Sequence, residues 1–176
     1  MKRKILVLIV LNIISFNFSL GQSNIKFKPG VKLIENYYKD EFKDPKSVLF
    51  SFDIVGCQAN YYTNLAKSLK KYFKKTNTKV EFNFNIKTNI ETEQIPRKKY
   101  LKSNFELICF VSTSNMKSWD KELIKRRKQN YDLDLIFEKA ETKENVGKLK
   151  LNINSYYTIA TQNKNSSKLI CKLITR

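Results

Sequence analysis

The alternation of apolar and polar residues predicts a sheet-and-helix domain from residue 47 onward. "VLFSFDIV" (48–55) and "FELICFVS" (105–112) are nearly continuous apolar runs, which is typical of strands covered on both faces. "KVEFNFNIK" (79–87) and "YDLDLIFEK" (131–139) alternate strictly, as half-buried strands do. The apolar positions of this second pair, which we expect to face the core, are Val80, Phe82, Phe84, Ile86, Tyr131, Leu133, Leu135 and Phe137.

Two longer stretches have helical spacing. "NYYTNLAKSLKKYFKK" (60–75) gathers apolar side chains on one side and lysines on the other. "SNMKSWDKELIKRRKQ" (114–129) has a similar apolar stripe, with acidic residues early and basic residues late, an order that complements a helix dipole. A further short helix is predicted around Lys32–Phe42.

The end of the chain is predicted to be a set of strands. "KLKLNI" (148–153), "YYTIATQ" (156–162) and "KLICKLI" (168–174) are apolar strand-like runs, and "NKNSS" (163–167) reads as a hairpin turn between the last two. The predicted fold class is therefore α/β, in the α+β sense. It has a single mixed β-sheet, two main amphipathic helices and a C-terminal antiparallel hairpin.

The first 21 residues have the features of a secretory signal peptide. Lys2, Arg3 and Lys4 precede an apolar run from Ile5 to Ile14, which is too short to span a bilayer. Small residues then precede an expected cut before Gln22. The domains expected are a signal peptide over 1–21, a lead-in segment over 22–46 and a single α/β domain over 47–176.

This leader predicts an exported protein, periplasmic or secreted. Gln22 stands where a lipoprotein would have its lipidated cysteine, so the chain is not expected to be a lipoprotein. No later stretch is long and apolar enough to predict a transmembrane segment in the mature chain.

The chain is strongly basic, with a formal net charge of +18 that falls to +15 once the three leader cations are removed. Such a charge favours a polyanionic partner, either nucleic acid, anionic lipid or glycan. The alternative is a genome-wide preference for the codons of lysine, asparagine and isoleucine, which would raise the charge without any ligand. The candidate polyanion-binding face comprises Lys67, Lys70, Lys71, Lys74, Lys75, Lys125, Arg126, Arg127 and Lys128.

The residues needed for several common chemistries are missing. The chain contains no histidine, which excludes cysteine–histidine catalysis at Cys57, and Gly56 is not followed by the glycines of a nucleotide-binding loop. We expect no cofactor and no bound nucleotide. Asp132 and Asp134, with Glu138 nearby, could contact Ca²⁺ or act as a carboxylate pair, but they also fit the solvated face of an alternating strand.

The cysteines suggest packing rather than reactivity. Cys57, Cys109 and Cys171 are an odd number, so at most one intramolecular disulfide can form. Cys109 and Cys171 lie inside apolar runs, where cysteine usually behaves as a small buried hydrophobe. Which two of the three pair, if any do, is left open by the sequence.

The order of elements resembles a known group of exported domains. Residues 48–73 as strand then helix, 105–112 as a middle strand and 156–174 as a closing hairpin are similar to the amino-terminal domain of TolB and related envelope-assembly lipoproteins. This resemblance implies a non-enzymatic domain that acts through protein partners in the envelope. The chain departs from the group by its missing lipidation cysteine and its positive charge, and no site residue is carried over.

Three functional hypotheses follow. The leading one is an exported, non-catalytic binding or envelope-assembly domain with an envelope protein as partner, and hence not an enzyme. The second is a secreted cationic effector that binds a polyanion. The third is a histidine-free hydrolase that uses carboxylates.

Overall fold

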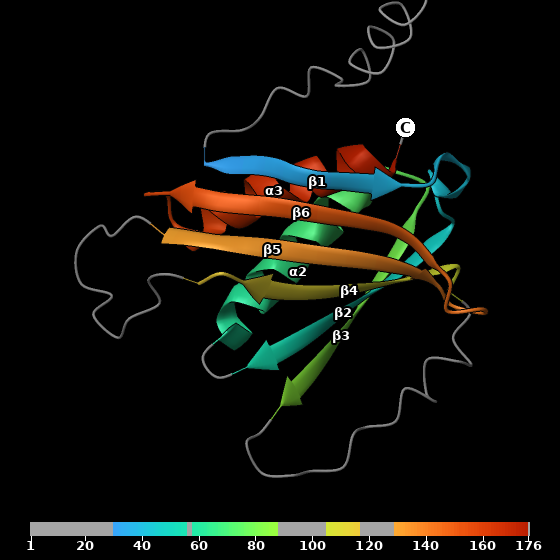
Figure 1. Cartoon of the computed structure of the whole chain (residues 1–176), viewed down its shortest axis with the longest axis horizontal. Helices are drawn as coiled ribbons and strands as arrows, with labels where there is room; N and C mark the ends of the chain where they lie inside the picture. The colour runs from blue at the N-terminus through green and yellow to red at the C-terminus, as the bar shows by residue number, and fades with distance from the viewer. Residues whose placement is uncertain (1–29, 56–57, 88–104, 117–128, 176) are drawn as a thin grey trace, which may run out of the picture.

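The domain is a six-stranded mixed sheet with two helices on one side. The computed structural model describes residues 30–55, 58–87, 105–116 and 129–175, and Figure 1 shows both helices behind the sheet. In chain order the elements are β1 (Val31–Tyr38), η1 (Asp40–Phe42), β2 (Ser47–Val55), α2 (Ala59–Phe73), β3 (Lys79–Lys87), β4 (Leu107–Ser114), β5 (Gln129–Lys139), β6 (Asn145–Ser155) and α3 (Ile159–Ile174).

The strand order confirms a mixed sheet. The strands lie in the order β1-β6-β5-β4-β2-β3. β2 pairs in parallel with both β3 and β4, whereas the other three pairings are antiparallel. The helix α2 connects the parallel strands β2 and β3, because parallel neighbours need a crossover connection rather than a tight turn.

The main core lies between the sheet and the two helices, and a smaller buried cluster of Leu49, Ile108 and Ala140 lies apart from it. The predicted inward residues of β5, from Tyr131 to Phe137, have at most a trace of exposed surface, and so do Phe50 and Phe52 of β2. The edge strand β3 is less covered than its pattern suggests. Phe82 stacks on Phe50 and Phe84 on Phe52, yet Phe84 remains 39% exposed because no strand lies beyond β3 in the described part.

The segment expected to hold a short helix around Lys32–Phe42 is instead mostly a strand. β1 pairs antiparallel with β6, with Val31 opposite Ile153, and is followed by the short 3-10 turn η1. A β-bulge between Leu33 and Glu35 interrupts the alternation that would have marked β1 as a strand. The sheet therefore begins before Ser47.

The predicted C-terminal hairpin over 156–174 is wrong, because the helix α3 forms there. Thr158 caps this helix, its side-chain oxygen accepting a hydrogen bond from the Thr161 amide. The antiparallel hairpin in this half of the chain is β5–β6 instead. The helix predicted over 114–129 lies almost wholly outside the described residues, so α2 and α3 are the two helices described.

Polar side chains, not only apolar ones, attach α3 to the rest of the domain. Gln162 is 1% exposed. Its Nε2 donates to Ser155 Oγ at 3.1 Å and to the Tyr157 carbonyl at 2.8 Å. Its Oε1 accepts a hydrogen bond from the Tyr131 hydroxyl at 3.0 Å. Asn163 Nδ2 donates to the Tyr61 carbonyl of α2 at 3.1 Å. These residues lie in or beside "NKNSS". Their polarity predicts an exposed turn, whereas the structure buries them on a packed helix.

Neither helix in the described part of the chain has the length and apolarity needed to cross a bilayer.

We predict that Gln162→Ala lowers the free energy of unfolding by about 2–3 kcal/mol, because the Tyr131 and Ser155 hydroxyls lose a buried partner. Chemical denaturation followed by circular dichroism measures this change. The matched control is Lys164→Ala, an exposed position on the same helix, which should change stability by less than about 0.5 kcal/mol. Equal effects of the two substitutions would contradict the docking of α3 through Gln162.

Candidate functional site

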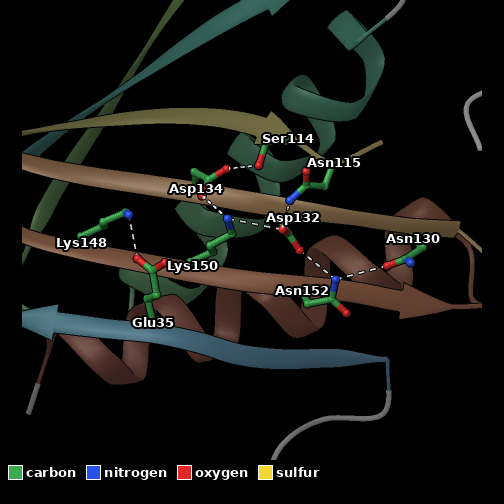
Figure 2. A network of polar contacts seen from close by, with 9 residues as sticks. All are labelled: Glu35, Ser114, Asn115, Asn130, Asp132, Asp134, Lys148, Lys150 and Asn152. Atoms are coloured by element: carbon green, nitrogen blue, oxygen red, sulfur yellow. Dashed lines mark hydrogen bonds and ion pairs between the residues drawn. The ribbon is translucent and has the colours of Figure 1, made fainter. Parts of the chain in front are cut away.

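A network of polar side chains lies on the sheet face opposite the helices. Because side chains alternate along a strand, the residues of β5 and β6 that do not enter the core emerge together on this face. Figure 2 shows this sheet-face network, which spans β1, β4, β5 and β6. Its members are Glu35, Ser114, Asn115, Asn130, Asp132, Asp134, Lys148, Lys150 and Asn152.

Asp132 is the most buried member and receives several donors. Its residue is 5% exposed. Oδ1 accepts from Asn152 Nδ2 at 2.8 Å and Oδ2 from Asn115 Nδ2 at 2.7 Å, while Lys150 Nζ lies 3.4 Å from Oδ2. Both carboxylate oxygens are therefore already engaged within the chain.

The backbone at the end of β4 helps to place one of these donors. Asn115 has a φ of 53°, in the left-handed region that asparagine tolerates better than most residues. Its amide reaches Asp132 from there (Figure 2). The preceding Ser114 donates its hydroxyl to Asp134 Oδ2. Two consecutive residues thus contact two carboxylates of β5, Asp132 and Asp134.

Lys150 is shared between the two carboxylates. Its Nζ lies 3.7 Å from Asp134 Oδ1 as well as 3.4 Å from Asp132. Next to it, Lys148 Nζ forms a 2.7 Å ion pair with Glu35 of the edge strand β1. The three carboxylates of the network are therefore paired at close range with its two lysines.

The pKa values of these groups reflect the pairing. Burial alone would raise the pKa of the Asp132 carboxyl, but the hydrogen bonds from Asn152 and Asn115 and the charge of Lys150 lower it overall. The Asp134 carboxylate raises the pKa of the Lys150 ammonium, with Asp132 adding to the effect. Both groups are charged around neutral pH.

This arrangement does not suit either chemistry considered for the carboxylates. A general acid needs a raised pKa and a cation site needs free oxygens, whereas Asp132 is held ionised and its oxygens are occupied. No group of three or more histidine, cysteine or acidic side chains that could hold a metal occurs among the described residues. The network is better described as a structural link between β4, β5 and β6.

The predicted lysine face is only partly described. The five lysines of 67–75 are exposed, as expected for the outer side of α2. The basic cluster Lys125–Lys128 lies outside the described residues. α3 exposes three further lysines that are not in the predicted face: Lys164, Lys168 and Lys172. The sequence pattern predicts strands for this segment, so the predicted face does not include them. Their spacing of four residues, which is typical of one side of a helix, is the signal that could have identified them.

The described cysteines are buried and unpaired. Cys109 and Cys171 are both free thiols. Burial raises the pKa of each, and at Cys171 a hydrogen bond with Thr175 offsets part of that effect. Cys57 and the neighbouring Gly56 lie outside the described residues. For Cys109 and Cys171, the expectation of packed cysteines agrees with the structure.

Comparison with known proteins shows the fold. No protein-family model matches the chain, and no curated protein matches it. Among solved structures, the PelC dodecamer from Paraburkholderia phytofirmans superposes with a TM-score of 0.54 at 8% identity, covering 83% of this chain and 99% of that one. A dodecamer of a single-substitution variant of PelC from the same organism gives 0.53 at 8% identity, over 83% and 98% of the two chains.

A third structure, a neuraminyllactose-binding hemagglutinin homolog from Helicobacter pylori, has a TM-score of 0.44 at 12% identity, over 76% of this chain and 88% of that one. The resemblance to the TolB amino-terminal domain is not tested by these structures and stays a prediction.

We predict that Lys150→Met lowers the unfolding midpoint by several degrees, because it leaves two neighbouring carboxylates without their shared cation. Lys148→Met is the matched control. It breaks only the solvent-exposed pair with Glu35, and such pairs contribute little. Thermal unfolding at neutral pH compares the variants, and an equal loss from both would contradict a special role for Lys150.

Stability should also depend on pH through Asp132. Because the folded-state pKa of this carboxyl is below its ordinary value of about 3.9, its contribution is complete above that value. The contribution is lost as the pH falls below about 3.9 and through the folded-state pKa. Denaturation curves between neutral and acid pH test this, and Asp132→Asn, which removes the titrating group, should show a shallower acid loss. An unchanged slope would refute the assignment.

Proposed function

We propose that this chain is an exported, non-catalytic domain that functions by binding and assembly in the cell envelope. The observation that carries the proposal is the likeness to PelC, which extends over 83% of this chain and 99% of that one. A likeness of that extent involves most of the domain rather than one local unit. The two PelC structures are dodecamers, and we infer that this chain likewise works in contact with other subunits.

The two outer strands offer surfaces for such contacts. Within the described part, β1 and β3 each have one edge without a neighbouring strand. Unpaired strand edges expose a row of backbone donors and acceptors that readily pair with another chain. Exposed apolar side chains lie on both edge strands: Ile34 and Tyr37 on β1 and Phe84 on β3 are 49%, 57% and 39% exposed.

The sheet-face network favours a non-catalytic role over the hydrolase hypothesis. A carboxylate pair that hydrolyses a glycoside needs one protonated group and one free group. Asp132 and Asp134 instead share Lys150 and accept hydrogen bonds from Asn115, Asn152 and Ser114. Their arrangement therefore favours a structural role.

We expect the mature chain, residues 22–176, to form an oligomer that dissociates when both strand edges carry charge. The variant is Tyr37→Lys with Phe84→Lys, which places an unpaired cation on each edge, where a neighbouring strand would have to bury it. Light scattering coupled to size exclusion measures the mass of each protein over a range of concentrations.

The control is Tyr156→Lys. This aromatic is 71% exposed but lies in the connection between β6 and α3, so the oligomer should persist. A wild-type chain that stays monomeric and captures no envelope protein would contradict the proposal. So would hydrolase activity that is lost on Asp132→Asn.

A further inference from the structure

In the described part of the chain, lysines lie on the helices and on the sheet alike, whereas acidic side chains are confined to the sheet, its connections and η1. Neither α2 nor α3 contains an acidic residue, and the sequence has no aspartate or glutamate over 54–80 or 145–176. The twelve acidic residues of the described part all lie on strands, connections or η1. We name the exposed lysines of the two helices and the α2 C-terminus the lysine layer: Lys67, Lys70, Lys71, Lys74, Lys75, Lys164, Lys168 and Lys172.

The lysines of the layer form no ion pairs with described residues, whereas several other described lysines do. Five lysines elsewhere in the described part form ion pairs: Lys39 with Glu144, Lys43 with Asp40, Lys79 with Glu81, Lys148 with Glu35, and Lys150 with Asp132 and Asp134. No lysine of the layer pairs with a described acidic residue. Lys32, Lys46 and Lys143 are also without an ion pair among the described residues, so the contrast is that every ion-paired lysine of the described part lies outside the layer.

The two helices are side by side and parallel, so their lysines form neighbouring rows. Near the helix starts, Asn163 of α3 donates to the Tyr61 carbonyl and to Asn64 Oδ1 of α2. At the other end, the last residue of α3, Ile174, accepts a hydrogen bond from the Asp44 amide, shortly before β2 begins. α2 ends at the same end of the sheet. The five-residue connection after Phe73 leads to Lys79, the first residue of β3, which pairs with Ser47, the first residue of β2.

The spacing within each row follows from helix geometry. Lys164, Lys168 and Lys172 are four residues apart, which places successive side chains about 6 Å along the helix. Lys67, Lys71 and Lys75 repeat the same step on α2 and its C-terminus. A flat anionic surface can therefore contact both rows at once.

We infer that the lysine layer binds an anionic lipid surface. The contact is electrostatic, because the apolar stripes of both helices are buried in the core and none of the exposed large hydrophobic side chains lies on α2 or α3. An interfacial helix that inserts into a bilayer needs such side chains on its outer face. The leader predicted over 1–21 would release the chain beside a bilayer.

The same features disfavour a linear polyanion. Binding of single-stranded nucleic acid uses aromatic stacking platforms, and the helices expose none: Tyr61, Tyr62 and Phe73 are buried and Tyr72 is half-buried. The layer also contains no arginine, the residue whose fork pairs with individual phosphates. The ammonium groups of the lysines are point charges on long side chains and are spread over two rows. This arrangement suits contact with a plane of lipid headgroups.

The test is vesicle co-sedimentation of the mature chain, residues 22–176, on phosphatidylcholine vesicles with and without phosphatidylglycerol. Binding should require phosphatidylglycerol and weaken steeply with salt.

Each lysine near an anionic bilayer contributes about fivefold in affinity, so K164Q/K168Q/K172Q should reduce binding ~100-fold. K67Q/K71Q/K75Q should reduce it by a similar factor, because both rows contact the same plane. Glutamine has nearly the same helix propensity as lysine, and circular dichroism checks that each variant is folded.

The matched control is K32Q/K46Q/K79Q, which removes the same charge from exposed positions outside the layer and should change binding little. An equal loss in control and layer variants would mean that net charge alone drives binding, and would overturn the inference. Equal binding to neutral vesicles would overturn it too. So would retention on heparin or single-stranded DNA, through the same lysines, by a chain that does not bind anionic vesicles.

Discussion

The burial of one face of the sheet under α2 and α3 determines which strand residues emerge on the opposite face. Phe50, Leu135 and their neighbours face the helices and are thereby removed from water, while a smaller cluster of Leu49, Ile108 and Ala140 is buried apart from them. Strand geometry then directs each intervening residue to the opposite face. Asp132 and Lys150 are therefore neighbours as a consequence of where the core lies, and their mutual pairing makes that polar face compatible with partial burial.

The same constraint explains why α3 carries polar residues inward. Gln162 and Asn163 are fully buried, but their amides bond to β5, the β6–α3 connection and α2, which offsets much of the cost of leaving water. The adjacent Ser166 and Ser167 are also fully buried, and their hydroxyls have no hydrogen-bond partner in the described part of the chain. Their side chains are small, which suits their position on the buried face of α3.

These particulars show which parts of the fold the sequence could predict. Strict alternation over 131–139 and helical spacing over 60–75 each favour one structure, and both predictions are confirmed by β5 and α2. The polarity of "NKNSS" predicts an exposed turn, whereas Asn163, Ser166 and Ser167 are buried on α3, so the pattern does not reveal this helix or its row of lysines. At β1 the bulge after Leu33 removed the period that identifies a strand. The carboxylates of β5 were visible as candidates, but their donors come from β4 and β6, and strand pairing cannot be read from spacing along one chain.

The charges of the described residues alone form an electric dipole directed across the sheet, with its positive end on the helix side. Such a dipole would rotate the domain as it diffuses toward an anionic plane, so that the orientation is selected before contact. Copies adsorbed in one orientation would hold the free edges of β1 and β3 at a common height above that plane. Encounters between edges would then occur in two dimensions instead of three, at a higher effective concentration.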